Sequence, residues 1–345
     1  MASQPDYANK LFVALVCLAA CLSTSALAWG PAGHHTIGAI ADQLIAGSNA
    51  AKQVRRLLRG GTLQNAAVWA DCARALDPAK NYAYTAPGRY PECAIYETPA
   101  LEAEMADFVR RNDTNCARTP TEESCHKQYH YTDIAVQRRR YLRHETGARD
   151  DDIVAATRAA IRVLEGEPAP APFNIKNERE ALLLLAHYVG DIHQPLHVGA
   201  VYLDTRGRRV DPDKTGFRPA TATRGGNQII VTVRTDKVRS TNLHHLWDDI
   251  PVTMTVPFVD SNWLTRARAV RRTSGTLDDW PTAWTNQTLY QSRLAFAHLK
   301  FGRKIGDKWH ATLPANYDAK MDAIKKRQLT RAGARLAQVL KAIWP

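Results

Sequence analysis

Residues 187–197 read HYVGDIHQPLH, and this stretch limits the fold of the chain more than any other. Four consecutive leucines precede it, so the sequence predicts a buried helix that ends near Pro195. His187 and Asp191 are four residues apart and therefore lie on one face of that helix, and His197 can fold back toward them. Buried imidazole and carboxylate groups carry a desolvation cost when they have no partner, so the fold must supply one here.

A second pair with the same spacing, His244 and Asp248, occurs in the segment STNLHHLWDD. The Ser-Thr-Asn at its start offers a good N-cap for a short helix. One His-x-x-x-Asp pair is more often a salt bridge on a helix than a metal site. Two such pairs in apolar sequence, together with His197, indicate a metal centre. Imidazole nitrogens and carboxylate oxygens without thiolates are the ligands of a catalytic zinc rather than of a closed structural one.

Helical periodicity dominates the rest of the chain, with apolar stripes at 37–45, 149–165, 177–195 and 329–343. The best strand candidate is QIIVTV at 228–233. The sequence therefore predicts one mainly α-helical domain over residues 29–345, with little β structure. Two stretches have the character of surface excursions. They are an insertion at about 73–128 and a Gly-, Pro-, Arg- and Asp-rich segment at 199–224.

The first 28 residues have the features of a secretory signal peptide, with an apolar run too short to span a bilayer and a small-x-small end at Ala26-Leu27-Ala28. They predict cleavage before Trp29 and a secreted or periplasmic product. An alternative is lipoprotein processing at Cys21, because Leu18-Ala19-Ala20-Cys21 fits that pattern as well. No other stretch is long and apolar enough for a transmembrane helix. We expect no stable membrane insertion, and we expect a monomer.

Four cysteines remain after the predicted signal: Cys72, Cys93, Cys116 and Cys125. In an exported chain they suggest two disulfides, for which three pairings are open. The formal net charge of +12 suits polyanionic partners such as nucleic acid, phosphorylated sugars or anionic lipid surfaces. The charge alone does not choose among them.

Six motifs and the closing segment AGARLAQVL (332–340) follow one another in a recognisable order. The motifs are WGPAGH (29–34), WAD (69–71), YHYTD (129–133), HYVGDIHQPLH (187–197), GGN (225–227) and NLHHLWD (242–248). In this order the chain resembles the zinc-dependent single-strand-specific nucleases of fungi and plants, which share a fold with bacterial phosphatidylcholine-preferring phospholipase C. The resemblance covers nearly all of residues 29–345. It implies the same mainly helical fold, with the disulfides holding the 73–128 insertion.

The resemblance also implies three zinc ions in one cleft. The first would be bound by Asp71, His130, His187 and Asp191. The second would be bound by His34, by Asp191 as a bridging carboxylate, and by the amino nitrogen and carbonyl oxygen of a terminal Trp29. The third would be bound by His197, His244 and Asp248. Cleavage at Cys21 would turn the Trp29 amino group into an amide, so this ligand set favours cleavage after Ala28.

The chemistry implied is phosphodiester hydrolysis, with Asp71, Arg74 and Asp191 as its catalytic residues. A zinc pair about 3.5–4 Å apart can hold a bridging hydroxide that attacks phosphorus in line, because zinc lowers the pKa of bound water to about 7. Arg74 would hold a phosphate oxygen. Tyr131 would stack on a base, a mode that favours unpaired strands, while Asp133 and Asn227 would bind the base edge.

The expected reaction is hydrolysis of single-stranded RNA and DNA to 5′-nucleotides, with an accompanying 3′-nucleotidase activity. One alternative is a phospholipase C acting on lipid headgroups, although those enzymes have a glutamate where this chain has Asp248. Another is an exported zinc-binding protein without activity. The longer 73–128 insertion and Arg224, which replaces a small apolar residue before GGN, depart from the family pattern. They leave base and strand preference open.

Overall fold

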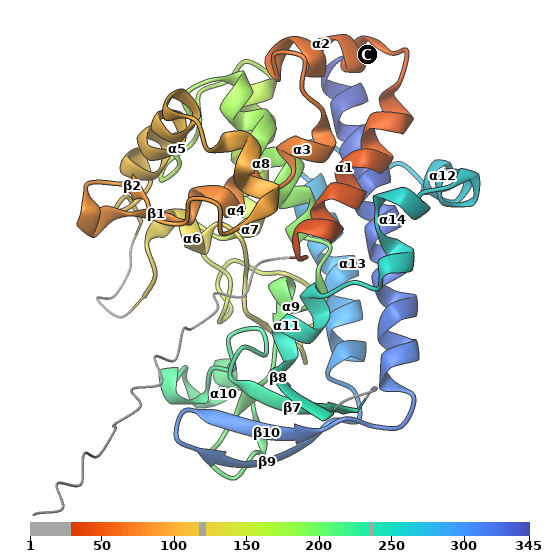
Figure 1. Ribbon diagram of the computed structural model, residues 1–345. Helices are drawn as coiled ribbons and strands as arrows, with labels where there is room; N and C mark the ends of the chain where they lie inside the picture. Colours follow the sequence, from red (N-terminus) through yellow and green to blue (C-terminus); the bar gives the residue numbers. More distant parts are fainter. Residues whose placement is uncertain (1–28, 117–121, 235–237) are drawn as a thin grey trace, which may run out of the picture.

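The computed structural model describes residues 29–116, 122–234 and 238–345, so the expected signal peptide at 1–28 lies outside the described residues. The long C-terminal helix α14 (Tyr317–Ile343) packs along α1 (Pro31–Ile45), and α8 (Glu178–Asp191) packs against α7 (Ile153–Leu164). In Figure 1, α13 (Trp280–Ala295) and α14 form the long helical side of the molecule. The expectation of a mainly α-helical domain is confirmed.

Shorter helices complete this scaffold. They are α2 (Asn49–Leu57), α3 (Leu63–Ala66), α4 (Trp69–Ala73), α5 (Pro99–Arg111), α6 (Cys125–Gln128), α9 (Pro195–Val198), α10 (Pro212–Thr215), α11 (Leu243–Asp248) and α12 (Ser261–Arg268). Short 3-10 helices lie at Pro78–Lys80, Pro91–Tyr96, Pro219–Thr221, Val252–Met254 and Val256–Phe258. No helix among the described residues is both long enough and apolar enough to cross a membrane.

Helix α8 is the central element, and all its residues from Glu180 to Asp191 are buried. It begins where the Asn177 side chain accepts a hydrogen bond from the Glu180 N–H at 2.9 Å, which satisfies an otherwise free donor of the first turn. The helix ends at Asp191, earlier than Pro195, and Pro195 starts the separate helix α9 at its first position. Proline fits there because the first N–H groups of a helix have no intrahelical partner.

One four-stranded sheet lies at the end of the molecule opposite α2, in the order β8-β7-β10-β9 (Figure 1). The predicted strand is β7 (Ile229–Arg234); it pairs antiparallel with β8 (Val238–Asn242) and parallel with β10 (Lys308–Thr312). The hairpin of β9 (Lys300–Ile305) and β10 has no counterpart in the sequence predictions, because it is largely exposed and lysine-rich. Two-residue strands form three further pairs: β1 (Leu76–Asp77) with β2 (Ala83–Tyr84), β3 (Ile134–Ala135) with β4 (Gly199–Ala200), and β5 (Tyr202–Leu203) with β6 (Arg209–Val210).

The stretch at 73–128 is more than a surface excursion. Helix α5 inserts Met105, Phe108 and Val109 into the main core, where the Phe108 ring lies 5.3 Å from that of Trp69. The disulfide Cys116–Cys125 closes within this stretch and Cys72–Cys93 joins it to the residue just before it, so that one of the three pairings that the sequence left open is selected. The Cys72–Cys93 disulfide ties the segment to α4. The segment at 199–224 is likewise buried over its first five residues and largely exposed after Leu203.

Candidate metal centre

Eight side chains from five separate parts of the chain gather into three groups that could each hold a metal ion. Within each group the candidate ligand atoms lie within 4.8 Å of one another. The groups are His34, His187 and Asp191; Asp71, His130 and His187; and His197, His244 and Asp248. These are all the side chains predicted as ligands, and the fold brings every one of them to the cluster.

Asp191 stands between the first two groups and divides its carboxylate between them. Its Oδ2 lies 3.0 Å from His130 Nδ1 and 3.0 Å from His187 Nε2, whereas its Oδ1 lies 3.3 Å from His34 Nε2. Asp71 Oδ1 is 3.8 Å from His187 Nε2, so Asp71 joins the side of Oδ2. This arrangement suits a carboxylate that bridges two cations.

Backbone carbonyls fix the orientation of three of the imidazoles. A carbonyl oxygen can only accept, so His187 Nδ1–H donates to Ala67 at 2.6 Å and leaves Nε2 free toward the cluster. His197 donates in the same way to the His130 carbonyl at 2.7 Å, and His244 to that of Gly225 at 2.9 Å. Such hydrogen bonds select the tautomer and hold the ring of a metal-binding histidine.

The outlying group, His197, His244 and Asp248, is held by two residues that sequence reasoning missed. Gln194 Nε2 donates to Asp248 Oδ1 at 2.6 Å, which leaves Oδ2 to face His244 Nε2 at 3.6 Å. The buried Lys325 ammonium donates to the Leu246 carbonyl at 2.8 Å and to that of Asp249, at the end of α11. The position of Gln194 inside the HYVGDIHQPLH motif could have identified it from the sequence. No sequence feature points to Lys325, because its partners lie more than 70 residues away.

Trp29 is fully buried, and its indole Nε1–H donates to the Gly190 carbonyl of α8 at 3.0 Å. The next residue, Gly30, donates its N–H to the Asp248 carbonyl at 2.9 Å. The start of the described chain is thus fixed between α8 and α11. Gly190 is also required for another reason, because a Cβ there would lie 2.8 Å from the His34 ring.

Several atoms of the cluster have no hydrogen-bond partner although they are buried. They are both ring nitrogens of His34, Asp71 Oδ1, Asp191 Oδ1 and Asp248 Oδ2. Buried polar atoms are normally satisfied, and these orphans point to cations as their partners. Nitrogen and carboxylate donors without sulfur suit zinc, so the residues present fit the metal that the resemblance implies.

The charge states of three imidazoles agree with this fit. Burial, followed by the neighbouring imidazoles, lowers the pKa of His34, His130 and His197 well below the ordinary value, so these rings are neutral and keep a free lone pair. Burial raises the pKa of Asp191 to about 7 although His187 and Arg74 oppose the shift, and burial likewise raises the pKa of Asp248 well above its ordinary value against the opposing effects of Gln194 and Lys325. Burial opposes the protonation of His187, but the Asp191 and Asp71 carboxylates outweigh it and raise its pKa to about 9.

Arg74 faces the cluster and is not a solvated surface residue. Its side chain is only 11% exposed, and its Nη1 lies 3.8 Å from Asp71 Oδ1. Its charge contributes, after burial and other groups, to the lowered pKa of His130, His197 and His244. The guanidinium charge therefore acts on the outlying group as well as on the groups that share His187 and Asp191.

The structure brings part of the predicted substrate-binding set together. The Gly225 N–H donates to the Asp133 carboxylate, yet burial is the larger effect and raises the pKa of Asp133 to about 6. Tyr131 is half-buried and lies near Asp133, which contributes after burial to its raised pKa. Asn227 donates its side-chain amide to the Arg224 carbonyl at 3.0 Å, so this amide nitrogen is turned toward its own loop.

Other histidines lie outside the three groups. His35 bonds the Gln64 carbonyl, His193 bonds Val189 and Arg335, and His245 is exposed. His126 is buried, and neither of its ring nitrogens has a hydrogen-bond partner among the described residues. Burial, then Lys127 and Arg74, lowers its pKa to about 3.

A protein-family model described as S1/P1 Nuclease matches residues 29–345. Among curated proteins, the chain is similar to Endonuclease 4 of Arabidopsis thaliana, with 26% identity over 94% of this chain and 91% of that protein. Endonuclease 5 of the same plant is 25% identical over 97% of both chains. Endonuclease 1 is 32% identical over about half of each chain, 49% of this one and 50% of the other.

Proposed function

The chain belongs to the S1/P1 nuclease family and is a nuclease, and from this premise we propose that it is a zinc-dependent phosphodiesterase of single-stranded RNA and DNA. Its products would be 5′-nucleotides, and removal of a 3′-phosphate from nucleotides would accompany the main activity. The divided carboxylate of Asp191 carries the proposal, because one side chain that faces two groups of buried ligands suits a two-metal phosphoryl-transfer site.

Three zinc ions would occupy the three groups of the metal centre. Asp71, His130, His187 and Asp191 would hold the first, and His34 with Asp191 the second. His197, His244 and Asp248 would hold the third. The amino nitrogen and carbonyl oxygen of Trp29 would complete the second set once the chain is cleaved after Ala28, and the buried, anchored position of Trp29 supports this role.

Bound zinc supplies acidified water at neutral pH and positive charge for the developing oxyanions. The chain's own contribution is position. Asp191 and Asp71 fix the paired ligand sets, while Gln194 and Lys325 hold α11 so that His244 and Asp248 face His197. Arg74 would donate two parallel hydrogen bonds to a phosphate oxygen pair, for which the planar guanidinium is suited.

Selection of unpaired strands would come from the pocket beside the cluster. Tyr131 would stack on a base, and stacking accepts every base but requires that it be unpaired. Asp133, held by the Gly225 N–H, would bind the base edge, with Asn227 at the same loop. Arg224 adds a positive charge to this loop.

We further propose that residues 1–28 direct export and are removed before Trp29, which yields a secreted or periplasmic monomer. The mass of the exported protein tests this directly. A mature chain that begins at Cys21 with an attached lipid would contradict it.

The function is tested by measuring the zinc content of the purified mature protein together with its turnover of single-stranded DNA, RNA, duplex DNA and phosphatidylcholine. We expect close to three zinc ions per chain and cleavage of single strands that stops with a chelator and returns with zinc. Lipid turnover without nucleic-acid cleavage would instead establish a phospholipase. A zinc-loaded protein without any turnover would establish a binding protein.

A further inference from the structure

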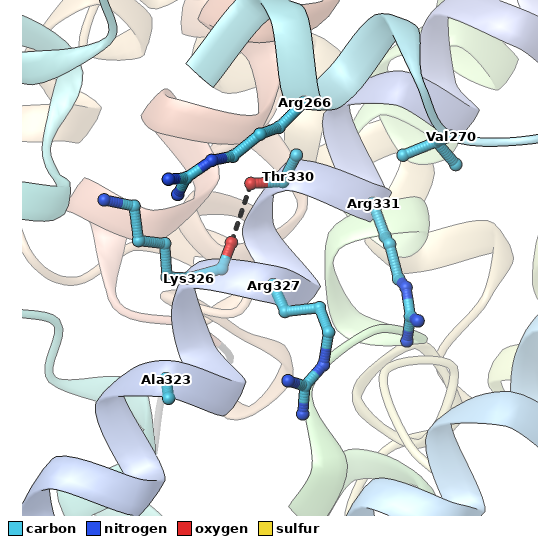
Figure 2. Close-up of a pocket in the computed structure, with 7 residues that line it drawn as sticks. All are labelled: Arg266, Val270, Ala323, Lys326, Arg327, Thr330 and Arg331. Atoms are coloured by element: carbon cyan, nitrogen blue, oxygen red, sulfur yellow. Dashed lines mark hydrogen bonds between the residues drawn. The ribbon is translucent and has the colours of Figure 1, made fainter. Parts of the chain in front are cut away.

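A cationic groove lies between α12 and α14, and no residue that lines it belongs to the metal centre. Two adjoining cavities of about 360 and 450 Å³ form it, and both are lined by Arg266 and Arg331. Figure 2 shows the first cavity, where Arg266 comes from α12 and Arg327 and Arg331 from α14. We call this feature the arginine groove. Its cations are Arg266, Arg271, Arg272, Arg327, Arg331 and Arg335, with Lys326 at one edge.

The charge of the arginine groove is not neutralised by the described residues. No Asp or Glu lines either cavity, and none of the seven cations forms an ion pair in the described part of the chain. Lys326 influences the pKa of Asp260, but the two do not pair. Within the described ranges, the Arg327 side chain donates to the neutral amide of Gln291 and that of Arg331 to the neutral amide of Gln328.

Arg335 shows that the groove has a fixed structure, because this arginine is buried and held by hydrogen bonds. It is 4% exposed, and it donates to His193 Nε2 at 2.7 Å and to Gln287. Its Nε is buried and has no partner. Burial, then the charge of Arg331, lowers its pKa to about 9. Arg331 and Arg335 are four residues apart on α14 and line the same cavity, so a bound anion would offset the repulsion between their charges.

We propose that the arginine groove is a second binding site, separate from the metal centre, for the phosphate backbone of the nucleic-acid substrate. Arginine forks match phosphate oxygens in pairs, and two connected cavities suit successive phosphates of a strand better than a single ion. The indole rings nearby, Trp263 and Trp280, are buried and face Lys326 and Arg272 as cation–π partners, so they are not available to stack on bases. Binding in the groove is therefore independent of base sequence. The choice of nucleic acid as the ligand rests on the proposed function, whereas the anion site itself does not.

The test compares Arg266→Gln/Arg331→Gln with a matched control, Lys300→Gln/Arg303→Gln, which removes two exposed cations from β9. Affinity for a long phosphorothioate single strand, which resists cleavage, is measured by fluorescence anisotropy at several salt concentrations. We expect the groove variant to bind about tenfold more weakly at low salt. The slope of log affinity against log salt concentration should become shallower by about 1.4, which is about 0.7 for each of the two lost phosphate contacts. The control should keep the wild-type slope, and cleavage of a dinucleotide should be unchanged in both.

Equal weakening in the control, or an unchanged slope in the groove variant, would overturn the proposal. A third arm uses vesicles of phosphatidylglycerol and phosphatidylcholine. Loss of vesicle binding with strand binding intact would identify a lipid surface as the ligand and would equally overturn it. If the wild-type protein cleaves no nucleic acid, the proposed function fails, but the anisotropy experiment still reports on the groove.

Discussion

At the scale of single residues, neighbouring side chains in the same motif have entirely different surroundings. His244 and His245 are adjacent in α11, yet His244 is buried with its Nε2 3.0 Å from His197 Nε2, and His245 is exposed. A helix turns by about 100° per residue, so only one of two adjacent histidines can face the cluster. A substitution of His245 is therefore a matched control for the same substitution of His244.

We expect His244→Asn to lose one zinc equivalent and to lower nuclease turnover at least a hundredfold, because a zinc ion stabilises transition-state charge by several kcal/mol. His245→Asn should keep both the zinc content and the turnover of the wild type. Zinc is measured by mass spectrometry and turnover on single-stranded DNA. Similar behaviour of the two variants would show that His244 is not a ligand.

Asp133 provides a prediction of pH dependence. Burial raises its pKa in the folded protein to about 6, above the value of about 3.9 in an unfolded chain. The folded state therefore binds the proton more tightly, and the stability gained from it at low pH is lost as the pH rises through about 6. We expect the free energy of unfolding of the wild type to fall, relative to Asp133→Asn, between about pH 4 and 6. Denaturant titrations of both proteins at each pH measure the free energy of unfolding. A difference between wild type and variant that stays constant from about pH 4 to 6 would show that the pKa of Asp133 is not raised in the folded protein.

At the scale of elements, the loop before β7 links the outlying metal group to the predicted base pocket. Its Gly225 donates to Asp133, accepts from His244, and has a φ of 56°, in the left-handed region. A Cβ at this position would overlap the Leu196 carbonyl oxygen. Gly216 has a φ of 78° but nothing within 4 Å of such a Cβ.

Alanine at these two glycines separates backbone strain from crowding. We expect Gly216→Ala to cost about 1 kcal/mol of stability from its positive φ alone. Gly225→Ala should cost clearly more, because the loop must move away from Leu196, and zinc should be lost from the outlying group as the His244 contact breaks. Thermal unfolding and zinc content report the two effects. Equal losses in both variants would mean that the close approach to Leu196 is unimportant.

At the scale of the whole molecule, the segment at which we propose that the mature chain begins packs against the candidate metal centre. Trp29 is hydrogen-bonded to α8 and Gly30 to α11, so this segment joins two elements that carry candidate ligands. Proteolytic processing and metal binding should therefore be coupled.

An alanine added before Trp29 converts its amino group into an amide, which cannot bind zinc in the same way. We expect this extended protein to hold one zinc ion fewer and to lose most of its nuclease activity, whereas an alanine added after Pro345 should change neither. The mass of each intact protein confirms the terminus, and zinc content and turnover give the result. Full activity of the extended protein would remove Trp29 from the ligand set.

The residue types and spacings of the metal centre could be read from the sequence because they depend on local geometry. The four-residue steps of His187 to Asp191 and of His244 to Asp248 place each pair on one helix face in any fold that contains these helices. The apolar stripes likewise predicted α1, α7, α8 and α14, and the family motifs named the eight side chains that the fold brings together.

Only the tertiary structure decided which atoms meet. The division of Asp191 between two groups, the inward direction of Arg74, the support of α11 by Lys325 and the pairing of the cysteines all depend on how distant elements pack. The arginine groove is the clearest case. Arg327, Arg331 and Arg335 follow one another at four-residue steps along α14, but only packing brings them to Arg266, Arg271 and Arg272. The physical reason is that local sequence sets the face of one helix, whereas contacts between helices far apart in the chain are fixed by the burial of the shared core.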